Sequence, residues 1–156
     1  MSFKNYALGT NPAILADALA SVGSSGVIIL GYVSVLPASA SNYQTLQKLN
    51  TAGAGPTGYQ VTTGKVLYIA KMLFLNQTAA HGINEIGFGD NAVNNSGSAP
   101  TNSVALISGI DLGATIVRTP TLMDLGFLPV RDQKFPYLRA NSTGGSFNAL
   151  FLCFEE

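Results

Sequence analysis

The sequence has few charged residues, one cysteine, one histidine and no tryptophan, and these shortages exclude several classes of protein. Charged residues make up 10% of the 156 residues, against about 25% in an ordinary soluble domain. Acidic and basic residues balance to a formal net charge of zero. A soluble monomer normally protects itself with surface charge. We therefore expect either a permanent assembly that buries much of the surface or a neutral polar shell that tolerates high local density.

The single cysteine, Cys153, excludes an internal disulfide. It lies in the apolar run 149–154, and no cationic residue stands beside it in sequence. This setting favours a buried, inert thiol over a reactive nucleophile. The start of the chain shows no secretory signal, and the longest apolar run, Val27–Leu36, is shorter than the about 20 residues that span a bilayer. We therefore expect a soluble protein with no membrane partner.

Basic residues are too few and too mixed with acidic ones to favour nucleic acid binding. The densest basic group, with the two aspartates that lie among it, is Arg118, Asp124, Arg131, Asp132, Lys134 and Arg139. Phosphate binding needs clustered Lys and Arg. We expect a solvated or paired set of charges and no nucleic acid partner.

The stretch Lys65–Asn76 predicts a strand at the centre of the fold. Both its odd and its even positions are apolar for most of the length, and only Lys65 and Lys71 interrupt them. A strand with one solvated face alternates more cleanly. We therefore expect a second sheet on one face, and another part of the chain or another subunit on the other.

The beginning of the chain predicts only short elements. Asn11-Pro12 resembles a helix N-cap followed by proline at the first helical position, and the Ala- and Leu-rich residues 13–20 predict one or two helical turns. Val27–Leu36 predicts a strand that is suited to pairing with a partner sheet. Tyr43–Leu49 predicts a single helical turn.

Residues 38–58 are weakly patterned and rich in Gly and Ser. A loop of this length inside a compact domain is often an interaction segment. We therefore place a domain boundary here. Met1–Gly58 is expected to be an N-terminal arm or subdomain used in assembly, and Tyr59–Glu156 a compact β domain.

From Tyr59 onward, short strands are separated by Gly, Pro and Asn. Besides the central strand, the predicted strands are Tyr59–Thr63, His81–Phe88, Ser103–Ile107, Gly113–Arg118, Leu122–Val130, Phe135–Ala140 and Ser146–Phe154. Gly126 predicts a bulge in its strand. About eight strands at intervals of about 8–12 residues are typical of an all-β sandwich or barrel. We expect a jelly-roll-like antiparallel β-sandwich, because eight strands in two sheets make that plan.

No catalytic set stands out. His81 is the only histidine, and no serine lies in a Gly-x-Ser-x-Gly pattern that would place a nucleophile beside it. The carboxylates Glu85, Asp90, Asp111 and Asp124 fall in different strands or loops, so nothing selects a catalytic pair. We expect no enzyme, no catalytic residue and no cofactor.

The segment Gly87-Phe88-Gly89-Asp90 lacks the third glycine and the following helix of a nucleotide-binding loop, so we expect a strand end that enters a turn. The oxygen-rich side chains of Asp90, Asn91, Asn94 and Asn95 are compatible with Ca²⁺, although their spacing is not that of an EF-hand. A solvated loop without metal is the favoured interpretation, and a cation site is the alternative.

Sugar binding is a second possibility, because β-sandwiches often bind glycans. Lectin sites stack sugars on aromatic faces, most often those of tryptophan, which this chain lacks. The tyrosines that remain as platforms are Tyr6, Tyr32, Tyr43, Tyr59 and Tyr137.

Several segments of the second half are neutral, rich in Gly and Asn, and dense in strands. They are Gly64–Ile69, Ile86–Asp90, Phe135–Asn141 and the terminal Cys153–Glu156. In these segments the chain resembles the β-sandwich decoration, or cement, proteins on the capsids of tailed bacteriophages. The resemblance implies trimers on the capsid surface of a virion, seated at capsomer junctions, where they clamp neighbouring major capsid proteins. It carries over no functional residue.

Three hypotheses follow. The first is a structural virion protein, a trimeric capsid decoration protein whose arm reaches into the shell or a neighbouring subunit. The second is a glycan- or receptor-binding module of a fibre or spike. The third is a small β-barrel enzyme that depends on His81.

Overall fold

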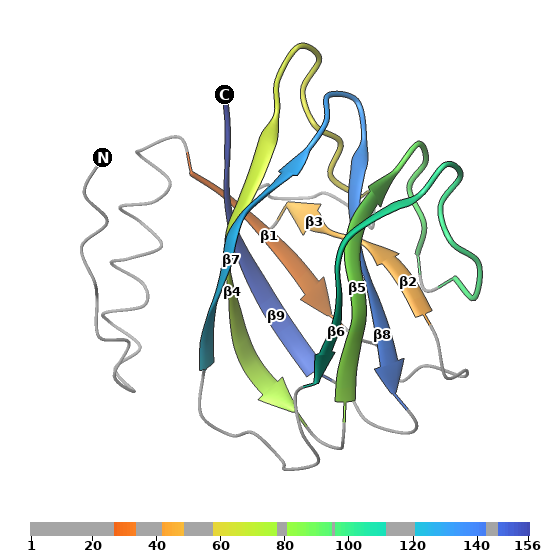
Figure 1. Ribbon diagram of the computed structural model, residues 1–156, viewed down its shortest axis with the longest axis vertical. Helices are drawn as coiled ribbons and strands as arrows, with labels where there is room; N and C mark the ends of the chain where they lie inside the picture. The colour runs from red at the N-terminus through yellow and green to blue at the C-terminus, as the bar shows by residue number, and fades with distance from the viewer. Residues whose placement is uncertain are drawn as a thin grey trace.

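The computed structural model of the chain describes residues 27–33, 42–48, 58–77, 81–94, 96–111, 121–142 and 147–156. Every regular element in these ranges is a β-strand (Figure 1). In chain order the strands are β1 Val27–Val33, β2 Asn42–Thr45, β3 Gln47–Lys48, β4 Leu67–Gln77, β5 His81–Gly89, β6 Val104–Asp111, β7 Thr121–Val130, β8 Phe135–Ser142 and β9 Phe147–Glu155.

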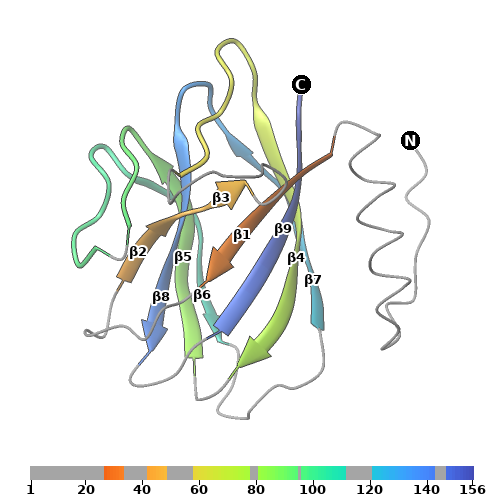
Figure 2. The ribbon, with the colours of Figure 1, turned by 180° about the vertical axis from the view of Figure 1, so that it is seen from behind.

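The strands form two antiparallel sheets that face each other across the core (Figures 1 and 2). Sheet A has the order β3-β1-β9-β4-β7, and sheet B has the order β2-β8-β5-β6. The predicted all-β sandwich is confirmed. The predicted short helix in residues 11–20 and the predicted strand Gly113–Arg118 lie outside the described residues.

Strand pairing is nested along the chain. The first described strand, β1, pairs with the last, β9; β2 pairs with β8, β4 with β7, and β5 with β6. The sheets are completed by β4 beside β9 and by β5 beside β8, and the short β3 extends sheet A past β1. Neither sheet can therefore form from one contiguous stretch of the described sequence.

The strand predicted at the centre, β4, lies inside sheet A between β9 and β7. Leu67 and Ile69 face the core, and the register then shifts at Ala70, so that Met72 rather than Lys71 faces the core. The bulge reverses which alternate positions point inward. This reversal, together with the apolar residues Tyr68 and Leu73 on the opposite face of the strand, explains why both the odd and the even positions of the sequence look apolar.

The core lies between the two sheets and combines residues from both. Its fully buried members include Leu30, Leu67, Ile69, Met72, Ile86, Leu138, Phe151 and Cys153. Each large apolar side chain stabilises the fold by about 1.5–3 kcal/mol relative to exposure. The expected burial of Cys153 is confirmed, and burial raises the pKa of its thiol, which keeps the sulfur protonated and unreactive.

Most of the longer predicted strands are confirmed within a few residues, but two local predictions are wrong. Tyr59–Thr63 is not a strand; its backbone bonds instead to Leu46 and Lys134, from different parts of the chain. Tyr43–Leu49 was expected to form a helical turn, and the described residues 43–48 contribute to β2 and β3. Elements this short carry too little periodicity to distinguish the two conformations.

The structure also differs from the expectation of an arm that ends at residue 58. In the described residues before that position, β1 lies between β3 and β9, and β2 pairs with β8. Leu30 and Leu46 are fully buried. Residues 27–33 and 42–48 are therefore part of the sandwich rather than of a separate subdomain. Without β1, the strand β9 would lose one of its two neighbours in sheet A.

Leu30→Ala tests this role of β1. The substitution removes a fully buried side chain opposite Phe151 and should lower the free energy of unfolding by about 2–5 kcal/mol, measured by urea denaturation. Val104→Ala is the control, because Val104 is 45% exposed and its truncation should change stability by about 0.5 kcal/mol. Equal losses in the two variants would contradict a core position for β1.

Candidate interaction surfaces

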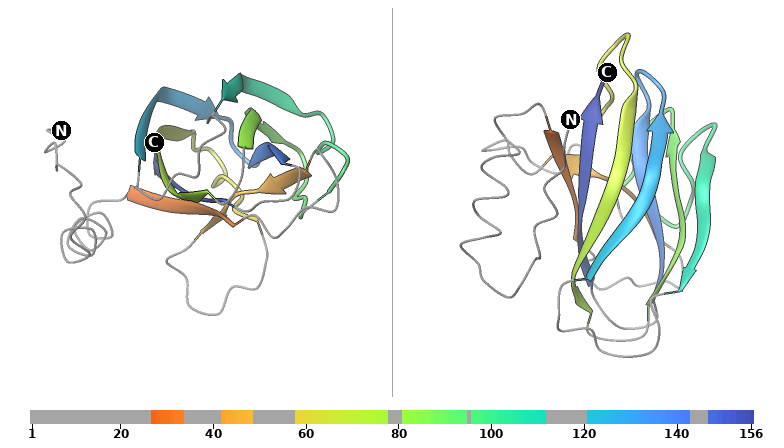
Figure 3. Two further views of the ribbon diagram at one scale, coloured as in Figure 1. Left: turned by 90° about the horizontal axis from the view of Figure 1, so that it is seen from below. Right: turned by 60° about the vertical axis from the view of Figure 1, so that its left-hand side comes forward.

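Three loops gather at one end of the sandwich: residues 58–66, the loop that begins at Asp90, and residues 131–134 (Figures 1 and 3). Polar contacts join them. The Gln60 side-chain amide donates to the carbonyl oxygen of Gln133 at 2.9 Å, and the Gln133 side chain donates to the Thr63 hydroxyl at 3.2 Å. This end is a polar surface held by side chains of different loops.

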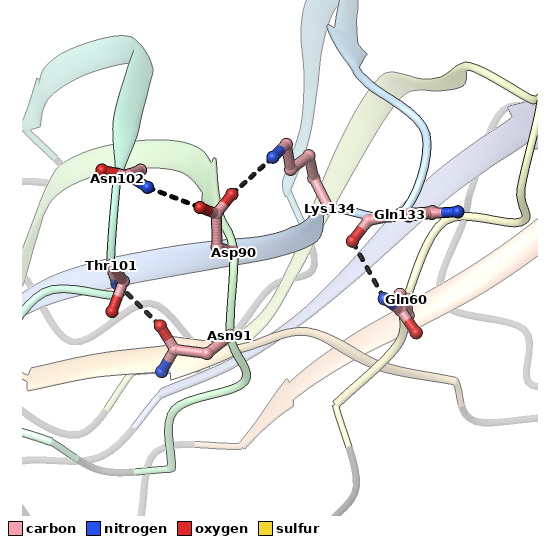
Figure 4. A network of polar contacts seen from close by, with 7 residues as sticks. All are labelled: Gln60, Asp90, Asn91, Thr101, Asn102, Gln133 and Lys134. Atoms are coloured by element: carbon pink, nitrogen blue, oxygen red, sulfur yellow. Dashed lines mark hydrogen bonds and ion pairs between the residues drawn. The ribbon is translucent and has the colours of Figure 1, made fainter.

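Asp90 lies at the centre of the polar network in Figure 4. Its Oδ2 accepts a hydrogen bond from the Asn102 amide at 2.6 Å, and its Oδ1 binds the ammonium group of Lys134. Beside it, the Thr101 backbone N–H donates to Asn91 Oδ1 at 2.7 Å. Both carboxylate oxygens of Asp90 are therefore already used within the chain.

These contacts argue against the alternative of a Ca²⁺ site in this loop. The Asp90 carboxylate is neutralised by Lys134, and an ammonium group at that position would repel a cation. Within the described ranges, no group of three or more His, Cys, Asp or Glu side chains is placed to hold a metal ion. Gly89 ends β5 and Asp90 begins a bend, so the predicted strand end that enters a turn is confirmed.

The same loop protects the free edge of β2. The Tyr43 N–H donates to the Ser96 carbonyl at 2.8 Å, and the Ser96 N–H donates back at 3.0 Å. The Thr45 N–H donates to the Val93 carbonyl at 2.9 Å, and the Val93 N–H donates to the Thr45 hydroxyl at 2.8 Å. Unpaired edges invite association with other strands, so these contacts remove β2 as a site of partner pairing.

A further polar group ties the loop 58–66 to β9. The Tyr59 hydroxyl donates to Glu155 Oε1 at 2.5 Å, and the Thr62 N–H donates to the same oxygen at 2.9 Å. Burial acts to raise the pKa of Glu155, but the hydrogen bonds from Thr62 and Tyr59 outweigh it, so the pKa is lowered overall. Burial, and then the bond to Glu155, raise the pKa of Tyr59.

Sheet B has a compact polar cluster built on Glu85. The Tyr137 hydroxyl donates to Glu85 Oε1 at 2.8 Å, and Arg139 lies 3.7 Å from Glu85 Oε2. The Arg139 guanidinium also lies 5.2 Å from the centre of the Tyr43 ring. Burial first, and the bond to Glu85 second, raise the pKa of Tyr137, so this phenol stays a hydrogen-bond donor.

The carboxylates considered as catalytic candidates are not brought together. Glu85 lies beside Arg139, Asp90 beside Lys134, and Asp124 beside Lys71. The backbone of His81 begins β5 and that of Asp111 ends β6, and their side chains are not described. Nothing in the described part of the chain therefore selects an acid–base pair.

The outer face of sheet A is apolar, in contrast to the polar end. On β9, Leu150, Leu152 and Phe154 alternate with buried residues and point away from the core, because successive side chains of a strand point to opposite faces. Their register neighbours on β1 and β4 include Ile29, Tyr68 and Leu73. On the next strand of this face, Leu122 of β7 pairs with Leu73. Ile29 and Leu73 are buried within the face, whereas Leu122 is 43% exposed.

An aromatic cluster lies on this face. Tyr68 and Phe154 stack with ring centroids 5.2 Å apart, and Phe127 meets Phe154 edge-on at 5.9 Å. Phe127 is nevertheless 47% exposed. We use "outer face of sheet A" for this surface. It consists of the apolar residues Ile29, Tyr68, Leu73, Leu122, Phe127, Leu150, Leu152 and Phe154, together with the charged pair Lys71 and Asp124.

The predicted bulge at Gly126 is confirmed and explains how Phe127 reaches the surface. Gly126 has φ +67° and Phe127 has φ +61°. Between Ile69 and Lys71, β4 advances two residues, whereas β7 moves from Leu128 to Asp124. The extra residues in β7 form a bulge that projects the Phe127 ring outward.

Comparison of the chain with protein-family models, with curated proteins and with solved structures gives no match in any of the three. In the ranges that the structure describes, no helix has the length and apolar character needed to cross a membrane.

Sequence reasoning did not identify Tyr68, Phe127 and Phe154 as surface residues. A signal existed on β9, because Leu150, Leu152 and Phe154 occupy the alternate positions where a solvated sheet face carries polar residues. No comparable signal marked Phe127, because its exposure depends on a left-handed backbone conformation that bulky residues rarely adopt.

Gly87→Ala tests the packing on sheet B. A Cβ atom at Gly87 would lie 2.2 Å from the Val104 carbonyl oxygen and 2.9 Å from the Tyr137 hydroxyl. The backbones of β5 and β6 must then separate, and we expect a loss of stability of about 1–3 kcal/mol in thermal or urea unfolding. Gly97→Ala is the control, since a Cβ atom there meets nothing within 4 Å. A Gly87 variant as stable as this control would refute the close approach.

Asp90→Asn tests the loop network through its pH dependence. The hydrogen bonds from Lys134 and Asn102 hold the pKa of Asp90 below its ordinary value. A carboxylate whose pKa is lowered in the folded state stabilises the fold at pH values above its ordinary pKa. This stabilisation is lost as the pH falls through the folded-state pKa. Asp90→Asn should therefore lower the free energy of unfolding at neutral pH, and the deficit should shrink in acid.

Urea denaturation across this pH range measures the deficit. In a Lys134→Met background, Asp90→Asn should have a smaller effect, because the main partner of the carboxylate is already missing. A deficit that stays constant from neutral to strongly acidic pH would show that the network does not depend on the charge of Asp90.

Proposed function

We propose that this chain is a non-enzymatic structural protein of a virion, a jelly-roll protein that decorates the capsid surface as a trimer and clamps neighbouring major capsid proteins. The observation that carries the proposal is the apolar outer face of sheet A. An antiparallel sheet of a free monomer commonly has one face in the core and one polar, solvated face. Here the second face has large apolar side chains, which is the composition of a contact surface.

The nested pairing supports the jelly-roll assignment. A jelly roll is a folded ribbon in which the first strand pairs with the last and each inner pair follows in turn, wound into two sheets. The pairs β1–β9, β2–β8, β4–β7 and β5–β6 follow this order, and β3 is a short addition. Jelly rolls occur in viral capsid proteins and in lectins. The fold therefore supports both classes of function, and the residues on the surface must distinguish between them.

The charge distribution favours a structural role over chemistry. Glu85, Asp90 and Asp124 each lie beside a cationic side chain of the same chain, and Cys153 is buried. A clamp needs no proton transfer or nucleophile; many copies with modest apolar contacts supply avidity instead.

The alternative of a glycan- or receptor-binding module has less support from the described tyrosines. Tyr137 is fully buried, and the hydroxyl of Tyr59 is engaged by Glu155. Tyr43 packs against Tyr137 and lies beside Arg139. Tyr6 and the side chain of Tyr32 lie outside the described residues. No described tyrosine from the proposed set is favoured as a sugar platform.

Light scattering on the purified protein tests the proposal. A trimer has a mass of 3 × 16.2 kDa, or 48.6 kDa. We expect this mass at micromolar concentration, and we expect it to persist at about 1 M salt, because apolar contacts are not screened by ions. A clean monomer would contradict self-assembly. A trimer that dissociates in high salt would point instead to contacts between charged residues.

A further inference from the structure

We infer that the outer face of sheet A is the surface through which copies of this chain contact one another, with Phe127 as its aromatic anchor. The inference goes beyond the proposed function and shares with it only the self-association of the chain. A face that meets the same face of a second copy forms a two-fold contact, which pairs two copies and does not by itself close a trimer. Three observations on the described residues support it: the conformation of Phe127, the aromatic cluster, and the two charges on the face.

The first observation is the backbone conformation of Phe127. Its φ of +61° lies in the left-handed region, which costs a residue with a Cβ atom about 1–2 kcal/mol relative to a right-handed conformation. The result is an aromatic ring that remains 47% exposed. Strain of this kind is retained where it serves a site, and the edge-on contact with Phe154 still leaves nearly half of Phe127 exposed to solvent.

The second observation is the support beneath the ring. Phe127 rests edge-on against Phe154, which stacks on Tyr68. These rings come from three adjacent strands, β7, β9 and β4. The anchors of protein interfaces are typically aromatic side chains that sit near the centre of a patch and are fixed by their neighbours. The cluster therefore presents Phe127 as a rigid projection with apolar residues around it.

The third observation indicates what the partner is. Lys71 and Asp124 are register neighbours on this face, with Nζ and Oδ2 3.9 Å apart. The Asp124 side chain is 70% exposed and that of Lys71 28% exposed. A partner surface of one sign would repel one of the two residues. A second copy that presents the same face offers a lysine to the aspartate and an aspartate to the lysine, so the face is complementary to itself.

Phe127→Asp and Phe127→Gly test the anchor, with sedimentation velocity as the measurement and circular dichroism as the check on folding. Aspartate places a charge in the contact. Glycine adopts the left-handed conformation without strain, so this variant removes the ring while keeping the fold. We expect both variants to weaken self-association at least about tenfold. Val104→Asp is the control, because Val104 is equally exposed but lies in sheet B, and it should associate like the wild type.

Charge reversal tests whether the partner is a second copy. Lys71→Asp and Asp124→Lys should each associate more weakly than wild type at low salt, because like charges then meet across the contact. An equimolar mixture of the two variants should regain association, since each supplies the charge that the other lacks. If the mixture is as weak as the separate variants, the two charges do not face each other between copies, and the assignment of the partner is overturned.

The outcomes separate this inference from the proposed function. If the wild type associates and both Phe127 variants keep its mass, the contact surface lies elsewhere, and self-assembly still stands. If the wild type is a monomer at micromolar concentration, both ideas fail. A monomeric wild type whose Phe127→Asp variant binds more of an apolar dye would show that another part of the same chain covers this face.

Discussion

The pairing of β1 with β9 is the contact on which the rest of the sandwich depends. It joins strands whose first register pair is Val27 and Phe154, and it gives β9 its second neighbour inside sheet A. Leu30 and Phe151 meet in the core through the same pairing. Because the other pairs are nested within this one, the ends of the described chain must meet before sheet A is complete, and the entropy of closing this long loop opposes folding.

The surface divides into regions with different physical roles. The loop end uses hydrogen bonds and ion pairs within the chain, so the charges of Asp90 and Glu155 are satisfied locally. The outer face of sheet A instead offers apolar side chains with one pair of opposite charges. In the described part of the chain, the few charged residues therefore fix the loops, while two of the large exposed apolar side chains, Leu122 and Phe127, lie on the outer face of sheet A.

Much of the secondary structure was predictable, because long apolar runs bounded by Gly, Pro and Asn record where strands begin and end. The sequence did not predict which side chains of β4 face the core, because the bulge at Ala70 reverses the inward and outward positions without changing the composition of the strand. The strands β2 and β3 were missed because four and two residues carry no measurable period. The position of Phe127 depends on its left-handed φ, which propensity does not encode for a phenylalanine.

The nested strand order also determines how long β1 waits for β9 during translation. Phe154 follows Val27 by 127 positions (154 − 27), and ribosomes add about 5–20 residues each second. The earliest described strand, β1, therefore waits for roughly 6–25 s before β9 has been made. During this interval, the apolar segment Val27–Val33 has only the two-residue strand β3 as a pairing partner within its own chain. A chaperone or a transient collapse of the nascent chain must protect this segment until β9 has been made. High-level expression would be the first condition to exceed that protection.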